Sequence, residues 1–412
     1  MSVWIQRQEV RAVIVAVLLV VLYSATARYS APYGVDAFTN AAQARAFAED
    51  QDSTLEEFSG FETDEFRGSL AWFVESPEGV TSQYPPGAAA WATPFYLFDS
   101  SFEFQEFSNE TPLSGSQDVA AADVIEFDVP IPNLAPASLA AALSVAIAMA
   151  FFMLTLSKVM PAKAAALSVA LAAIGTGAWS VAADRLWQHG PAMMCISGGT
   201  YLASINRFAA SGLFFGAGVI VRPHTAVVAA GIGVVVAWRR RSLREMSLLG
   251  GVSALGLVAL VVYNNSVFGS PSISGGYSSA FGNRLVSESP FTVIGRLAGS
   301  LVHLQVGILW TSPFIALSLF ALWKARGSAP DWSVGAALGG FAYLVIQFRA
   351  NRLTGGGDFF SYRYPLEALM AAGPLLAIST WTWLQEPGRN RRVFAVLAGL
   401  SVFAHGAGAV LT

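Results

Sequence analysis

The chain has 412 residues, of which 54% are hydrophobic and only 12% are charged, and its formal net charge is −3. Long, recurrent apolar runs exclude an ordinary water-soluble domain and indicate a polytopic membrane protein. The single cysteine, Cys195, cannot form an intrachain disulfide. No nucleic-acid partner is expected.

Eleven apolar segments predict membrane spans. The first follows Arg7 and Arg11 and precedes no convincing cleavage site, so we expect it to be retained rather than removed as a signal peptide. The predicted fold class is an all-α polytopic membrane protein with about 11 transmembrane helices, and residues 1–412 form one transmembrane domain. The spans are placed at residues 11–27, 135–157, 164–182, 190–204, 208–221, 223–239, 245–263, 300–323, 332–349, 366–384 and 392–411.

The charges give these spans an orientation. With the N-terminus inside, the cytoplasmic segments hold 14 of the 24 basic residues, and 23 of the 27 acidic residues fall outside. Lysine and arginine concentrate in cytoplasmic loops of membrane proteins. The N-terminus is therefore predicted to lie in the cytoplasm and the C-terminus outside.

The largest outside segment, residues 28–133, is a loop inserted after the first span, with 19 acidic and 3 basic residues. A connector of that length indicates a function. Alanine-rich residues 36–48 predict a short helix, and the alternation in 102–107 is typical of a half-buried strand. The apolar run 88–98 is long enough to lie in the membrane interface but too short to cross it. The loop is thus expected to contain interfacial helices and a small β-hairpin.

Asp36 is the first candidate for chemistry, because it lies just beyond the first span at the start of the acidic loop. A carboxylate close to lipid is costly and is seldom kept without a use. One interpretation is a general base that takes a proton from an acceptor hydroxyl. The other is an N-cap for the helix that follows. The two interpretations are compatible.

Two arginines are candidate donor-phosphate-binding residues. Arg222 lies at the outer junction of two predicted spans, where its guanidinium could hold a phosphate or simply snorkel. Arg363 follows three glycines and Asp358, and lies between Tyr362 and Tyr364. It is interpreted as a second phosphate contact or as the partner of an outward carboxylate, while the tyrosines also suit a membrane-interface belt.

Five further residues are predicted to bind substrate. His189 could hydrogen-bond a sugar or a phosphate, although a lone histidine at such a boundary is more often structural. No two of the four histidines show metal-ligand spacing, so no metal site is predicted. The acidic residues of the large loop could take a divalent cation but show no liganding pattern, and a solvated acidic face is the better interpretation. The predicted substrate-binding residues are Tyr84, His189, Asp358, Tyr362 and Tyr364.

Taken in order, these pieces resemble the GT-C glycosyltransferases, specifically the dolichyl-phosphate-mannose mannosyltransferase-like and RgtA/B/C/D-like group. The resemblance runs from about residue 30 to 375. It is carried by Asp36 after the first span, YPPG at 84–87 before an apolar stretch, LWQHGP at 186–191, GVIVRP at 218–223, WTSPF at 310–314, and GGD at 356–358 leading to RYP at 363–365.

The resemblance implies a GT-C-like fold, a sugar donor carried on a polyprenyl phosphate, and transfer with inversion on the non-cytoplasmic face of a bacterial or archaeal cell membrane. It also implies that Asp36 matches the family's first-loop acidic residue. The phosphate roles of Arg222 and Arg363 come from their chemistry. The expected partners are membrane lipid, the lipid-linked sugar, and a glycan, lipid or protein acceptor in the cell envelope.

Two features depart from that group. The nearest second carboxylates, Glu49 and Asp50, lie a full helix away from Asp36, and the chain is short, with no added carbohydrate-binding domain. The acceptor and the oligomeric state therefore stay open. The alternatives are a polysaccharide polymerase or ligase that uses lipid-linked sugars, and a lipid-sugar transporter or flippase. A transporter predicts repeated broken helices, and no internal repeat is visible.

Overall fold

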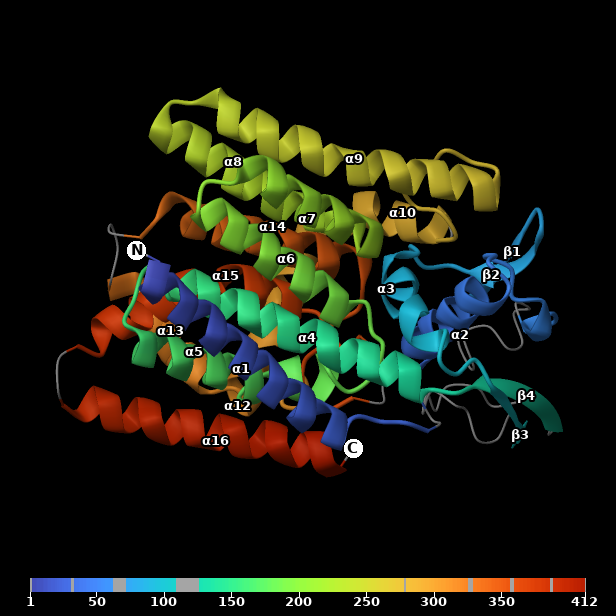
Figure 1. Cartoon of the computed structure of the whole chain (residues 1–412), viewed down its shortest axis with the longest axis horizontal. Helices are drawn as coiled ribbons and strands as arrows, with labels where there is room; N and C mark the ends of the chain where they lie inside the picture. Colours follow the sequence, from blue (N-terminus) through green and yellow to red (C-terminus); the bar gives the residue numbers. More distant parts are fainter. Residues whose placement is uncertain are drawn as a thin grey trace.

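The computed structural model describes residues 2–30, 33–61, 72–108, 126–277, 279–324, 329–355, 359–385 and 388–411. It is a bundle of helices with a smaller unit at one end (Figure 1). Five helices in this part of the chain are long and apolar enough to cross a membrane, at Gln8–Thr26, Ala135–Leu156, Leu243–Phe268, Asp331–Ala350 and Arg389–Leu411. The fold is that of a helical membrane protein, as predicted.

Most helices of the bundle follow the predicted apolar segments closely. The span predicted at 164–182 is instead α5, which ends at Ile174, and a separate π-helical turn, η2 (Ala178–Ala182). Because each segment is apolar throughout, the helix bounds are decided by the polar and proline-containing turns between them. The bundle consists of α1 (Ser2–Thr26), α4 (Ala135–Leu156), α5 (Ala162–Ile174), α6 (His189–Ser204), α7 (Phe208–Val221), α8 (Ala226–Arg240), α9 (Leu243–Phe268), α13 (Phe314–Lys324), α14 (Asp331–Ala350), α15 (Leu366–Trp383) and α16 (Arg389–Leu411).

The prediction of one continuous span at 300–323 was wrong. The chain there forms the end of α11 (Pro290–Val302), the short α12 (Ile308–Thr311) and α13. The last break precedes Pro313, whose ring disfavours a helical conformation in the preceding residue, and Ser312 is accordingly outside the helical region at φ −129°. The segment before α11 also holds a helix that was not predicted, α10 (Ser279–Ser287).

Small residues set how closely the helices approach. A Cβ added to Gly256 of α9 would overlap the carbonyl oxygen of Gly216 in α7, and one added to Gly335 of α14 would lie 2.5 Å from the Cα of Ile232 in α8. Backbone-to-backbone contact of this kind holds helices together where lipid removes the usual hydrophobic driving force. The pairs α7–α9 and α8–α14 are therefore tight, and they carry the upper layer of the bundle in Figure 1.

The smaller unit, here called the acidic unit, comprises the described residues between 33 and 133. Its elements are α2 (Val35–Glu49), η1 (Glu56–Phe58), β1 (Phe73–Ser76), β2 (Gly79–Ser82), α3 (Gly87–Tyr96), β3 (Phe102–Ser108) and β4 (Glu126–Pro132). β1 pairs antiparallel with β2, with Phe73 opposite Ser82, and β3 pairs with β4, with Phe102 opposite Pro132. The predicted helix at 36–48 and strand at 102–107 are confirmed, and there are two ribbons instead of one hairpin.

An aromatic cluster forms the core of the acidic unit. The ring of Phe58 lies 4.7 Å from that of Phe73, 5.8 Å from Phe38 and 6.5 Å from Phe102. Helix α2 is buried on nearly all sides, because its alanines let α3 and the strands approach closely. A helix buried all round has no face reserved for polar side chains, so its apolar residues need not follow one stripe.

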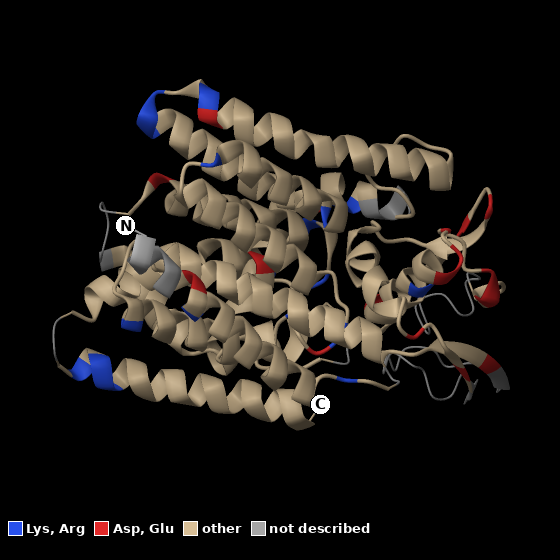
Figure 2. Ribbon diagram, viewed as in Figure 1, with Lys and Arg blue, Asp and Glu red and all other residues tan. Residues whose placement is uncertain are grey.

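The charges separate along the bundle. Figure 2 shows lysine and arginine at one end, at the α8–α9 turn and the start of α16, and the acidic residues gathered on the acidic unit at the other end. The N-terminus lies at the basic end, and α16 runs back to place the C-terminus at the end nearer the acidic unit (Figure 1). The termini thus lie at opposite ends, as expected for an odd number of crossings.

We predict that Gly256→Val destabilises the protein by about 1–3 kcal/mol, because the added side chain forces α9 away from α7. The measurement is the midpoint of thermal unfolding in detergent. The matched control is Gly250→Val in the same helix, where an added Cβ meets nothing within 4 Å. Equal midpoints for the two variants would contradict the role given to the α7–α9 contact.

Candidate functional site

The chain turns sharply into α2 just before Asp36. Gly34 is the N-cap at φ 77°, a left-handed conformation that favours glycine, and a Cβ there would lie 2.8 Å from the ring of Trp187. Asp36 itself lies in the first turn of the helix, where the helix dipole favours a carboxylate. The interpretation of Asp36 as the N-cap was therefore wrong.

Asp36 meets two other predicted site residues. Its Oδ2 pairs with Nη1 of Arg363 at 2.9 Å, and its Oδ1 accepts a hydrogen bond of 2.7 Å from the hydroxyl of Tyr84. The Asp36 side chain keeps 24% of its surface exposed, so the carboxylate stays accessible. Of the two interpretations of Arg363, the structure shows the partner of an outward carboxylate.

Tyr84 is held as a hydrogen-bond donor. Burial and the nearby Asp36 carboxylate raise the pKa of its hydroxyl well above the ordinary value, so the phenol stays protonated. Its ring packs edge-on against Tyr277 at 5.9 Å. Tyr84 therefore fixes one carboxylate oxygen, while Arg363 fixes the other.

The Arg363 guanidinium is buried among aromatic rings. It lies 4.6 Å from the ring centre of Trp187, 5.1 Å from Tyr364 and 5.4 Å from Phe359. Burial alone would lower the pKa of Arg363, but the Asp36 carboxylate and Tyr364 raise it by more. The side chain is thus a permanent cation in an apolar, aromatic setting, where cation–π contacts are strongest.

Three buried N–H donors around Trp187 lack a hydrogen-bond partner within the described part of the chain: Arg185 Nη1, Trp187 Nε1 and Arg363 Nε. The Arg185 guanidinium lies 5.7 Å from the Trp187 ring and is otherwise paired with Asp184 at 2.7 Å. A buried donor without a partner costs about 1–3 kcal/mol and calls for an explanation. A cluster of donors with no matching acceptor suits an anionic ligand.

Arg222 belongs to a second buried ion pair. Its Nη1 lies 2.6 Å from Oε1 of Glu367, and the same oxygen accepts from Nδ1 of His189 at 2.8 Å. Arg222 also donates to the hydroxyl of Tyr343 at 3.1 Å. His189 is therefore committed to a protein carboxylate, which agrees with the structural role considered for it.

The two ion pairs are neighbours. Tyr364 contacts Arg363 and also lies 6.5 Å, ring to ring, from His189. Burial raises the pKa of the Tyr277 hydroxyl. The Arg222 cation lowers that pKa and the Asp36 carboxylate raises it, so Tyr277 lies near both ion pairs. Asp36, Arg222 and Arg363 thus gather at the end of the bundle that adjoins the acidic unit.

Two predicted residues do not join this cluster. Tyr362 is buried, and its hydroxyl faces Ser312 at 2.9 Å instead of the Asp36 carboxylate. Asp358 lies outside the described residues. Tyr84, His189 and Tyr364 are the predicted substrate-binding residues that lie beside the ion pairs.

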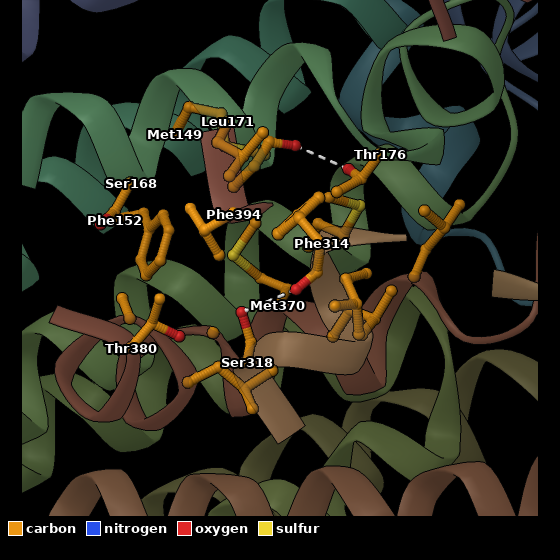
Figure 3. A pocket seen from close by; sticks show the side chains of 18 residues that line it. Met149, Phe152, Ser168, Leu171, Thr176, Phe314, Ser318, Met370, Thr380 and Phe394 are labelled. Carbon is orange, nitrogen blue, oxygen red and sulfur yellow. Dashed lines mark hydrogen bonds between the residues drawn. The ribbon is translucent and has the colours of Figure 1, made fainter. Parts of the chain in front are cut away.

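An apolar cavity of about 90 Å³ lies between α4, α5, α6, α13, α15 and α16, shown in Figure 3 with Phe152, Leu171, Phe314, Met370 and Phe394 among the labelled side chains. Along α15 it extends from Leu366 to Thr380, which is roughly 20 Å at the helical rise. Leu366 adjoins Glu367 of the second ion pair. The cavity therefore begins directly beneath the charged cluster.

Metal ligands do not gather in the structure. No group of three or more His, Cys, Asp or Glu side chains that could hold a metal ion occurs among the residues described.

No protein family model matches the chain, and no curated protein matches it. The site is therefore interpreted from its own geometry.

Sequence reasoning missed Glu367, Arg185 and Trp187. Glu367 was assigned to the end of an apolar span, and a single carboxylate there gives no sign of its partner. An intramembrane acid normally has a cationic partner, and that rule could have matched Glu367 with Arg222. Arg185 and Trp187 lie next to His189 in the sequence, but only the fold shows that their donors are unpaired.

We predict that Glu367→Ala destabilises the protein by about 3–5 kcal/mol, because Arg222 is left as a buried unpaired charge. The double variant Glu367→Ala with Arg222→Ala should lose less stability than either single variant, because no charge of this pair is left without a partner. Thermal unfolding of the four proteins in detergent measures this coupling. Additive losses would show that the two side chains do not depend on each other.

Proposed function

We propose that the protein is a GT-C-type membrane glycosyltransferase that moves a sugar from a polyprenyl-phosphate donor to an acceptor hydroxyl. The observation that carries the proposal is the Asp36–Arg363 ion pair beside unpaired N–H donors. A base for the acceptor and a cationic, donor-rich surface for a phosphate leaving group are the two parts that such a transfer needs.

The fold supports the proposal. The basic and acidic ends of the bundle match the charge asymmetry of a membrane protein whose acidic unit faces the non-cytoplasmic side. We interpret the other six helices of the bundle as further crossings beside the five long ones, which gives 11 spans; these six are α5, α6, α7, α8, α13 and α15. Asp36, Arg222 and Arg363 then lie on one side, near the headgroup region.

Asp36 is assigned as the general base. Both of its oxygens already accept one hydrogen bond, but each has a second lone pair that an acceptor hydroxyl can use. Tyr84 and Arg363 hold the carboxylate in one orientation, which favours proton transfer in the reacting complex. The attack of the hydroxyl on the anomeric carbon from the face opposite the phosphate inverts that carbon.

Arg363 is the first candidate for the donor phosphate. Its Nε and the nearby Trp187 Nε1 are buried donors that have no hydrogen-bond partner among the described residues. Arg222 is a second contact, through the N–H groups other than Nη1, which Glu367 occupies. Charge and hydrogen bonds from these groups would stabilise the leaving phosphate.

The apolar cavity supports a lipid-linked donor. It starts beside Glu367, and its lining is almost entirely apolar side chains. A volume of about 90 Å³ takes a short stretch of hydrocarbon chain, so the rest of a polyprenyl chain would lie along the lipid-facing surface. With its phosphate at Arg363 and its chain in the cavity, an amphipathic donor would lie across the boundary between the charged cluster and the apolar cavity.

We predict that Asp36→Asn lowers sugar transfer by at least about a hundredfold, because the general base is lost. The protein should stay folded but unfold at a lower midpoint than the wild type, because Arg363 loses its anionic partner. The assay uses the purified protein in nanodiscs with radiolabelled polyprenyl-phosphate sugars and acceptor extracts. The control is Glu75→Gln, an exposed carboxylate of the same acidic unit. Normal turnover in the Asp36→Asn variant would show that Asp36 is not the general base. Movement of the labelled lipid across the bilayer without turnover would favour a transporter.

We predict that Ala172→Phe raises the KM for a long-chain donor about tenfold and leaves kcat unchanged, because losing the burial of about two methylene groups costs ~1.6 kcal/mol. A donor with a chain too short to reach the cavity should be unaffected. The matched control is Leu167→Phe on the same helix, where the side chain is 60% exposed. If KM changed equally for both donors, the cavity would not be the binding site of the donor's apolar chain.

A further inference from the structure

A line of buried polar groups joins the last helix to the segment that carries Arg363. In α16, His405 is fully buried, and its Nδ1 lies 2.8 Å from the hydroxyl of Ser180. Its Nε2 lies 2.9 Å from the hydroxyl of Ser312, which in turn lies 2.9 Å from the hydroxyl of Tyr362. None of these groups contacts the Asp36 carboxylate directly.

The protons in this line can be assigned. Ser312 has one O–H, and it donates that proton to the carbonyl of Gly175 at 2.9 Å. Tyr362 and His405 must therefore both donate to Ser312. The imidazole carries its proton on Nε2, and Nδ1 accepts from Ser180. Every member of the line is satisfied in one arrangement only, which makes it a rigid connection.

The segment that carries Arg363 depends on this connection. Residues 359–364 form neither helix nor strand, and Ser361 has a positive φ of 80°, a conformation that non-glycine residues hold only when their surroundings enforce it. Two hydroxyl pairs supply that enforcement: Thr311 with Ser361 at 2.6 Å and Ser312 with Tyr362 at 2.9 Å. Arg363 follows directly.

We propose that His405 is a positioning residue for Arg363: through Ser312 and Tyr362 it fixes the segment that presents the guanidinium to Asp36. A polar side chain kept among apolar helices is expensive unless it serves such a purpose. The inference rests on the proposed function only in taking Arg363 as a site residue. It makes α16, which contributes no side chain to the charged cluster, a part of the site's support.

Two amide substitutions separate the two bonds of the imidazole. The side-chain amide of asparagine reaches about as far as Nδ1, and that of glutamine about as far as Nε2. His405→Gln should therefore keep the bond to Ser312 and lose the bond to Ser180, while His405→Asn should do the reverse. The control is Ser401→Ala, which removes an equally buried hydroxyl of α16 that bonds within its own helix to Leu397.

The test is hydrogen–deuterium exchange of residues 359–364 in nanodiscs, with α4 as the internal reference. We expect His405→Asn and Tyr362→Phe to speed exchange of this segment about tenfold, the effect of one buried hydrogen bond. His405→Gln and Ser401→Ala should stay within about twofold of the wild type. Equal exchange in the asparagine and glutamine variants would overturn the inference.

The same variants are then compared in sugar transfer. If the wild type transfers sugar, His405→Asn should lower kcat/KM about tenfold and His405→Gln should restore it. If the wild type transfers none, the exchange experiment still decides whether His405 holds the Arg363 segment, and only the proposed function fails. Loss of activity in both variants with unchanged exchange would also overturn the positioning role.

Discussion

The Asp36–Arg363 ion pair is the contact on which the arrangement of the two parts of this molecule depends. Asp36 lies in the first turn of α2, the first helix of the acidic unit, and Arg363 lies in the segment that enters α15 of the bundle. A buried guanidinium surrounded by three aromatic rings cannot be left without an anion. The pair therefore fixes the charged part of the boundary between the acidic unit and the bundle. Hydrogen bonds such as that from Asn40 to the Leu186 carbonyl join the two elsewhere, and the aromatic cluster around Phe58 holds the unit itself together.

The two arginines of the charged cluster, Arg363 and Arg222, each already have an anion. Asp36 neutralises Arg363, and Glu367 neutralises Arg222. A phosphate would therefore gain little from net charge. It would gain more from hydrogen bonds to donors that no described residue pairs with, at Arg185, Trp187 and Arg363. Such a site would select ligands whose acceptor oxygens lie in the directions of its N–H donors. Its affinity for a lipid-linked ligand would depend on the apolar chain as well as on the phosphate.

The sequence predicted the elements better than their partners. Apolar runs located the helices at 135–157 and 208–221 almost to the residue, because period and length are local properties. The predicted span at 300–323 failed because the conformation of Ser312 before Pro313 outweighed the apolar composition. Asp36 and Arg363 were each singled out, but Glu367 was not, since pairing across the bundle leaves no local mark in the chain. The conformation of Ser361 likewise depends on hydroxyl groups supplied by a distant segment.

The first turn of α15 connects the charged cluster with the cavity. Successive residues of a helix point about 100° apart, so Leu366 lines the cavity while Glu367, the next residue, bonds to Arg222 and His189. Arg363 lies one turn earlier, and the N–H of Leu366 donates to its carbonyl. A ligand with a charged group at Arg363 and an apolar chain along α15 would meet both environments without bending sharply. The distance between the two is fixed by a single helical turn, so a displacement of α15 would move the phosphate contact and the chain contact together.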